Sequence, residues 1–270
     1  MSRFALSNLA WPMDDEGALE TLAEAGLNGV EVALTRIAPW EALDRQALVT
    51  YRNQLESHGL AAPSLQALLF GVEGVSLLGD EDAFERMVVH LSRVARCGEQ
   101  LGAKIAVFGS PRQRSRGALS HEDAFELGAS RFLRLAQTMN EAGMALGMEP
   151  VPKHYGGDFL TTADAVLAMV QAVNHPGLRQ HLDTGCVLLG GGDIRQAIRD
   201  GADALGHFHI AEPDLVGFDA PQADHAGAAQ ALAEINYQGW LSIEMLQAKD
   251  GATAAALSAL DFAQRTYAIV

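Results

Sequence analysis

Short apolar runs alternate with amphipathic stretches along the whole chain. The apolar runs have the length and residue types of β-strands, whereas in the stretches between them apolar residues recur every three or four positions, as in helices that pack one face on a sheet. The predicted strands are 4–9, 29–34, 62–68, 104–110, 146–151, 179–185, 206–212 and 240–246. The predicted helices are 16–25, 46–58, 82–101, 121–142, 163–173, 194–200, 226–235 and 253–267.

Glycines that come just before a predicted strand support this phasing, because a left-handed glycine commonly ends a helix. They are Gly26, Gly59, Gly102, Gly143, Gly201 and Gly239. Strict alternation of strands and helices predicts a parallel sheet, which is either a doubly wound sheet or a closed barrel. Eight units, with no Gly-x-Gly-x-x-Gly after the first strand and no linker, favour the barrel. We therefore predict an α/β fold, a single (β/α)8 barrel domain over residues 1–270.

Four polar residues lie at the C-terminal ends of four consecutive predicted strands. They are Glu149, Asp183, His209 and Glu244, and they are spaced by about one strand-plus-helix unit. An isolated acidic residue at a strand end is more often a helix cap, and a lone histidine is usually structural. Four in succession on one rim instead predict a metal site. Oxygen-rich ligands with one imidazole suit Mn²⁺ best, with Mg²⁺, Co²⁺ or Zn²⁺ as alternatives.

Further polar residues near the predicted rim are candidates for contacting a small molecule. Arg112, Arg114 and Arg116 follow the fourth strand and could bind a phosphate or carboxylate, or else pair with acidic helices. Glu31 on the second strand is another rim candidate, and His207 would point to the same strand face as His209 and hydrogen-bond a ligand carboxylate. The residues predicted to bind the substrate are Gln66, Arg112, Arg114, Lys153, His154, Cys186 and Glu212.

Composition narrows the classes of partner. A net charge of −15 disfavours nucleic acid, because a polyanion would be repelled. Apolar runs are shorter than a membrane-spanning helix needs, and acidic residues arrive by Asp14, unlike in a signal peptide, so we expect a cytoplasmic protein without a membrane partner. The two cysteines, Cys97 and Cys186, do not suggest a disulfide framework.

The segments MEPV, HLDTG, HFHIAEPD and YQGWLSIEM, which carry these four residues, resemble the xylose-isomerase-like TIM-barrel superfamily of sugar isomerases and epimerases. The resemblance covers essentially the whole chain. It implies that Glu149, Asp183, His209 and Glu244 ligate the metal, that Glu149 and Glu244 also act as the acid/base pair of a ketose epimerase, and that the protein forms a homo-oligomer. Three positions depart from the ketose-epimerase pattern, because Tyr155, Cys186 and Leu215 stand where a glutamate, a histidine and an arginine are expected.

The function predicted from these features is a metal-dependent isomerase or epimerase of a small sugar or sugar phosphate, which moves a proton through a metal-bound enediolate. One alternative is a metal-dependent dehydratase of a keto-polyol such as an inosose or a dehydroshikimate-like compound, and a basic group such as Lys153 or His154 on the leaving side would favour it. Another is a phosphodiesterase like endonuclease IV, against which the net charge argues. A metal-free sugar-binding barrel is the fourth.

Overall fold

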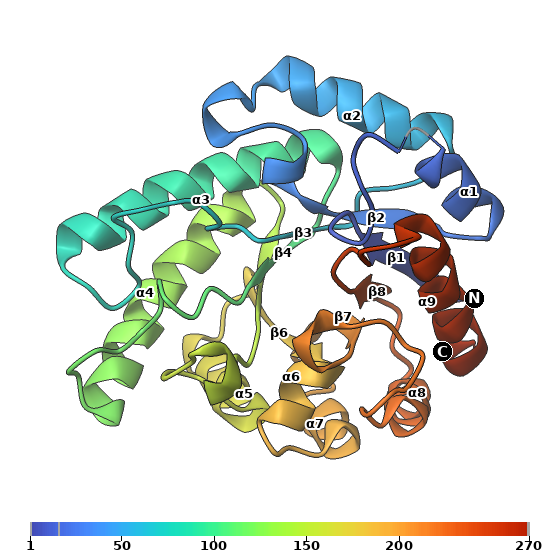
Figure 1. The fold of residues 1–270 in the computed structure, drawn as a ribbon. Helices are drawn as coiled ribbons and strands as arrows, with labels where there is room; N and C mark the ends of the chain where they lie inside the picture. Colours follow the sequence, from blue (N-terminus) through green and yellow to red (C-terminus); the bar gives the residue numbers. More distant parts are fainter. Residues whose placement is uncertain (1, 16, 269–270) are drawn as a thin grey trace.

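The strands of the computed structural model, which describes residues 2–15 and 17–268, close into a barrel that is surrounded by helices (Figure 1). Each strand runs parallel to its neighbours in chain order, and β8 closes the barrel against β1. The strands are β1 Arg3–Ser7, β2 Gly29–Ala33, β3 Ser64–Gln66, β4 Ile105–Phe108, β5 Ala145–Met148, β6 Leu178–Asp183, β7 Leu205–Ala211 and β8 Trp240–Glu244. The predicted (β/α)8 barrel is confirmed.

Helices follow the strands as predicted, with one addition. The α-helices are α1 Ala18–Glu24, α2 Arg45–Ser57, α3 Glu81–Leu101, α4 His121–Glu141, α5 Ala163–Val173, α6 Thr184–Leu189, α7 Ile194–Asp200, α8 His225–Glu234 and α9 Ala252–Tyr267. Short 3₁₀ helices are η1 Leu34–Arg36, η2 Trp40–Ala42, η3 Lys153–Tyr155 and η4 Pro213–Leu215. Glu16, the predicted start of the first helix, lies outside the described residues. Each helix in the described ranges is too short or too polar to cross a membrane.

The sixth strand ends earlier than predicted, and the reason bears on the site. Asp183 is the last residue of β6 and also the N-cap of α6, which the sequence pattern missed. Its Oδ1 accepts a hydrogen bond from the Cys186 backbone N–H at 2.6 Å. This capping bond turns the chain into a helix directly after the strand and holds the Asp183 carboxylate at the barrel end.

Two of the predicted left-handed glycines have another role. Gly26, Gly59, Gly102 and Gly143 have positive φ as expected. Gly201 has φ −89°, and Gly239 is not left-handed either. A Cβ at Gly201 would lie 1.9 Å from Gln180 Oε1, and one at Gly239 would lie 2.1 Å from the Tyr237 hydroxyl. These two glycines are required by close packing and not by a left-handed turn.

The inside of the barrel is unusually polar. In β7, Phe208 packs toward α9, with its ring centroid 6.2 Å from that of Tyr267, whereas His207 and His209 face Glu31 of β2 across the barrel interior. Apolar residues fill the layer between strands and helices, and the interior holds a buried polar network. Apolar packing between the strands and the surrounding helices therefore stabilises the barrel, and the interior can hold polar functional groups.

We expect Gly177→Ala to destabilise the fold. A Cβ at Gly177, directly before β6, would lie 2.1 Å from the Ala136 carbonyl oxygen of α4, and a backbone atom cannot rotate away. The expected loss in the free energy of unfolding is about 1–3 kcal/mol, measured by urea denaturation. Gly217→Ala is the control, because a Cβ there meets no atom within 4 Å. Equal stability of the two variants would show that the contact is relieved at no cost.

Candidate metal centre

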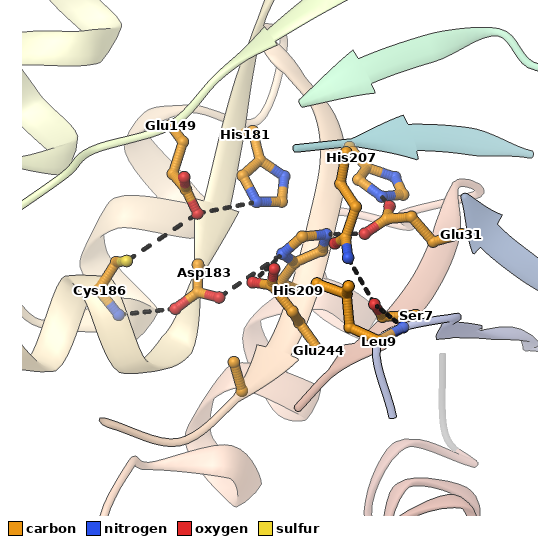
Figure 2. A network of polar contacts seen from close by, with 12 residues as sticks. Ser7, Leu9, Glu31, Glu149, His181, Asp183, Cys186, His207, His209 and Glu244 are labelled. Atoms are coloured by element: carbon orange, nitrogen blue, oxygen red, sulfur yellow. Dashed lines mark hydrogen bonds and ion pairs between the residues drawn. The ribbon is translucent and has the colours of Figure 1, made fainter. Parts of the chain in front are cut away.

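Four side chains converge at the C-terminal ends of β5 to β8. Glu149 follows β5, Asp183 ends β6, His209 lies near the end of β7 and Glu244 ends β8. One nitrogen or oxygen of each lies within 4.8 Å of one from every other. Figure 2 shows that they point toward one another from four neighbouring strands. The structure thus brings together all four residues that the sequence pattern predicts as metal ligands.

The His209 imidazole has a distinct partner on each side. Its Nδ1 lies 3.1 Å from Glu244 Oε2 and 3.6 Å from Asp183 Oδ2, so this nitrogen faces the carboxylates of the cluster. Its Nε2 lies 2.7 Å from Glu31 Oε1. A ligating histidine in metalloproteins is commonly oriented by a carboxylate on its other nitrogen. Glu31 occupies that place here.

Glu31 is itself held by several groups inside the barrel. It is fully buried, and its Oε2 accepts a hydrogen bond from Ser64 Oγ at 2.6 Å and lies 2.6 Å from His207 Nε2. The Gln66 amide satisfies its neighbours when its nitrogen donates to Glu31 Oε1 at 2.7 Å and to Glu244 Oε1 at 3.0 Å. Burial alone would raise the pKa of Glu31, but His209 and His207 together hold that pKa well below its usual value. Glu31 is therefore an ionised anchor.

The carboxyl groups of the cluster are electrostatically unfavourable neighbours. Burial, with the charges of Glu244 and Asp183, raises the pKa of Glu149 to about 8. Burial also raises the pKa of Glu244. For His209 burial lowers the pKa, but the carboxylates of Glu31 and Glu244 outweigh it and the pKa is raised well above its ordinary value. The cluster therefore favours the binding of a positively charged group.

These features fit a divalent cation. Asp183 Oδ2 is buried and makes no hydrogen bond, so it is free to bind an ion. The donors are three carboxylates and one imidazole, a set suited to hard divalent metals. A second group that could hold an ion comprises His181, His207 and His209, but Glu31 already contacts His207 and His209 through Nε2. The four-residue cluster is therefore the better metal site.

Two residues predicted to bind the substrate make hydrogen bonds within the protein. Arg114 is buried, and its guanidinium donates to the backbone carbonyl of Glu149 at 2.7 Å and to that of Leu160 at 3.2 Å. Burial lowers its pKa to about 10. Glu212 is also buried, with 2.6 Å between its Oε1 and His225 Nε2, and it accepts backbone hydrogen bonds from residues 222 and 223. Both side chains hold loops in place, and their contact with a substrate stays a prediction.

Three further predicted residues have partners inside the barrel. His207 contacts Glu31 and not a carboxylate of the ligand set, so its link to the cluster runs through Glu31. Gln66 contacts Glu31, Glu244 and Ser7, and its contact with a substrate stays a prediction. Glu31 lies in the barrel interior and not on the rim.

The remaining predicted residues lie near the mouth with differing exposure. Arg112 and Lys153 are exposed, and the structure assigns them no contact that would test their role. His154 Nε2 lies 2.6 Å from Asp214 Oδ1, while the Tyr155 hydroxyl accepts from the Asp214 backbone N–H at 2.6 Å. These two contacts join the loops after β5 and β7.

Cys186, another residue predicted to bind the substrate, lies directly beside the cluster. Its Sγ lies 3.9 Å from Glu149 Oε1 (Figure 2). Burial, reinforced by the charges of Asp183 and Glu149, raises its pKa well above the usual value. The side chain is therefore a neutral thiol beside the ligand set.

Sequence reasoning missed His181 and Ser7. His181 Nε2 lies 3.7 Å from Glu149 Oε1, and its ring centroid lies 4.1 Å from that of His209. Ser7 contacts the Gln66 amide at 2.5 Å. The available signal was a polar residue inside an apolar run, as in LRQHLD, with a strand parity that places His181 and Asp183 on one face. A polar residue inside an apolar run can be either a metal ligand or a neighbour of one, and the sequence pattern does not distinguish the two.

The fold and the cluster together define a (β/α)8 barrel with a carboxylate-rich candidate metal centre at the C-terminal ends of its strands. The family model described as xylose isomerase-like TIM barrel matches residues 19–265. The chain belongs to this family.

Individual relatives match the chain either over part of its length or at low identity. A D-psicose 3-epimerase from Enterocloster bolteae is 34% identical over 112 residues, which cover 41% of this chain and 37% of that protein. A probable ketose 3-epimerase from Synechocystis sp. is 24% identical over 259 residues, covering 92% of this chain and 85% of the relative. The solved D-psicose 3-epimerase with D-tagatose from Clostridium cellulolyticum H10 has a TM-score of 0.83 at 16% identity, covering 98% of this chain and 99% of that one. The chain thus spans about two fifths of the first curated relatives, and the structural likeness is one of fold.

We expect Glu31→Gln to weaken divalent-metal binding by about 10- to 100-fold, because the neutral amide no longer orients His209. Titration of the protein with Mn²⁺ measures this. Glu212→Gln is the matched control, since Glu212 is also a buried glutamate beside a histidine but lies outside the cluster. Its affinity should stay within about twofold of the unmodified protein. Equal losses in both variants would assign the effect to general destabilisation.

We expect the affinity for Mn²⁺ to rise with pH. Glu149 has its pKa raised to about 8, and its carboxyl must lose a proton before it can bind a cation. His209, whose pKa is raised well above its ordinary value, must also lose a proton, so below these pKa values the affinity should fall by more than about tenfold per pH unit, with up to about two protons released per ion. Calorimetric titration in buffers of different ionisation enthalpy measures both. Glu149→Gln should reduce the release by about one proton, and a pH-independent affinity of the unmodified protein would contradict the assignment.

Proposed function

We propose that this protein is a divalent-metal-dependent isomerase or epimerase of a small sugar or sugar phosphate. The observation that carries the proposal is the four-residue cluster, because its donor atoms lie within 4.8 Å of one another and include two glutamates on separate strands. Two relatives are described as D-psicose 3-epimerase and probable ketose 3-epimerase, which supports sugar epimerisation as the reaction. Mn²⁺ is the proposed ion on the basis of the donor set.

The residues proposed to hold the ion are Glu149, Asp183, His209 and Glu244. A divalent cation supplies Lewis-acid chemistry, which polarises a substrate carbonyl and makes the neighbouring C–H more acidic. Around it, Glu31 and Gln66 keep His209 and Glu244 in place. The side chains of Glu149 and Glu244 are 12% and 16% exposed, which limits the access of water to the acid/base groups.

Proton transfer is assigned to Glu149 and Glu244. Glu149 follows β5 and Glu244 ends β8, with β6 and β7 between them, so they flank the space above Asp183 and His209. One carboxylate removes the proton from the carbon next to the carbonyl, which gives an enediolate, and the other carboxyl returns a proton from the opposite face.

The groups around the cluster favour a substrate other than a free, fully hydroxylated ketose. Cys186 is a neutral thiol beside Glu149, and Tyr155 and Leu215 stand where the resemblance expects a glutamate and an arginine. Large exposed apolar side chains also occur in loops after β3, β7 and β8, which open on the same end of the barrel as the cluster. They are Phe70, Val216 and Leu246. Ketoses with a phosphate or an apolar substituent therefore belong in a substrate screen beside free ketoses and keto-inositols.

The dehydratase alternative finds less support. It requires a base on the leaving side in addition to the acid/base pair. Lys153 is exposed, and His154 Nε2 is engaged by Asp214 Oδ1 at 2.6 Å. Neither is directed at the cluster by a contact that the structure shows, so the epimerase is the preferred proposal.

We expect Glu149→Gln and Glu244→Gln each to lower turnover by about 10³-fold or more on whichever substrate the screen identifies, because each removes one half of the proton transfer. Glu212→Gln, a buried change away from the cluster, should keep turnover within about threefold. Exhaustive chelation should abolish turnover and Mn²⁺ should restore it. Full activity after chelation would refute metal dependence.

Solvent deuterium distinguishes the reactions in the same assay. An epimerase of this kind incorporates deuterium at the carbon next to the carbonyl of the turned-over sugar, as nuclear magnetic resonance detects. Turnover without incorporation would exclude proton exchange through the glutamates, and loss of water from the product would identify the dehydratase.

A further inference from the structure

A cavity lies at the opposite end of the barrel from the candidate metal centre. It has a volume of about 780 Å³ and is lined by residues at or before the N-terminal ends of β1 and β3 to β8, together with the C-terminal end of α2. Arg3, Lys104 and Trp240 are at its wall, and His207 is at its inner end. Its volume falls within the usual range for small-molecule sites.

Small residues form part of the cavity lining. Gly206 precedes His207 at the start of β7, Gly239 precedes Trp240 of β8, and Ala145 begins β5. Apolar surface comes from Leu60, Ile105 and the Trp240 ring. An apolar molecular body would therefore be accommodated without burying unpaired polar groups.

The rim of the cavity is cationic, although the protein as a whole carries a net charge of −15. Arg3, Arg52, Lys104 and Arg179 line it, and Glu56 is the one acidic residue among them. Glu56 lies 2.9 Å from Arg52 and so compensates that charge. Over residues 2–15 and 17–268, no carboxylate lies within ion-pair distance of the other three.

Backbone and ring contacts position two of these three cations. Arg3 donates to the Gln238 carbonyl at 2.8 Å, and its guanidinium carbon lies 4.9 Å from the centre of the Trp240 ring. Arg179 donates to the Asp203 carbonyl at 2.6 Å. These contacts restrict the side chains without neutralising them. A pocket with three uncompensated cations in an acidic protein attracts anions selectively.

We propose that this cavity is a second binding site, separate from the metal centre, for a small organic anion with an apolar body. The anionic group, a carboxylate, sulfonate or phosphate, pairs with Lys104, while Arg3 and Arg179 add to the positive potential of the cavity. The apolar body occupies the space against Trp240 and Ile105. Nothing in this assignment depends on the proposed sugar chemistry.

The test uses 8-anilinonaphthalene-1-sulfonate, an aryl sulfonate that fluoresces in apolar surroundings, with the full chain in the presence of Mn²⁺. We expect saturable binding of one molecule per chain. Lys104→Glu should weaken it about tenfold, because it reverses a charge at the rim. Lys249→Glu is the matched control, since Lys249 is an exposed lysine in the loop after β8 and should leave the affinity within about twofold.

A second variant keeps the test decisive. Ala145→Leu places a larger side chain in the cavity and should also weaken binding, with circular dichroism and thermal unfolding to show that the barrel remains folded. Naphthalene-2-carboxylate should displace the dye and inorganic phosphate should do so more weakly, whereas the neutral naphthalene-2-methanol should not. Unchanged binding in both variants, or equal displacement by the neutral alcohol, would overturn the proposal.

Discussion

The structure depends on one buried carboxylate, Glu31, in the middle of the barrel. An ionised carboxylate without partners would be costly there. Glu31 of β2 is stabilised by His207 and His209 of β7 and by Ser64 of β3. Because its contact with His209 Nε2 directs Nδ1 toward Asp183 and Glu244, the same interactions that make the buried charge tolerable also orient the candidate metal ligand. Interior stability and site geometry therefore have a common origin.

At the C-terminal ends of the strands, by contrast, three carboxylates repel one another. Glu149, Asp183 and Glu244 are brought together by four adjacent parallel strands, whose backbone geometry is set by the apolar layer under the helices. The raised pKa of Glu149 and of Glu244 expresses the cost of that proximity together with burial. The carboxylates stay close despite this repulsion because each is at or near a strand end, where the strand restricts its position. A cation bound between them would be attracted by all three carboxylates and would offset their mutual repulsion.

The cationic cavity and the acidic cluster are at opposite ends of the same barrel, and β7 contributes to both. His207 is the inner end of the cavity, while His209, two residues later, faces the cluster. Small residues line the cavity at the N-terminal end of the strands, and capping bonds such as that of Asp183 position side chains of the cluster at the C-terminal end. The two ends differ in sign of charge, so they would select different ligands.

The sequence by itself determined the barrel, because alternating strand and helix periods are local patterns, and it determined the four residues at strand ends, because parallel strands bring such ends to one rim. It also indicated that the groups around Cys186 differ from those of a ketose epimerase. Only the tertiary structure decided that Arg114 and Glu212 bind loops and that Glu31 supports His209. The reason is physical: chain spacing specifies which face and which end a side chain occupies, whereas its hydrogen-bond partner is chosen among groups that are distant in sequence and meet only in the closed barrel.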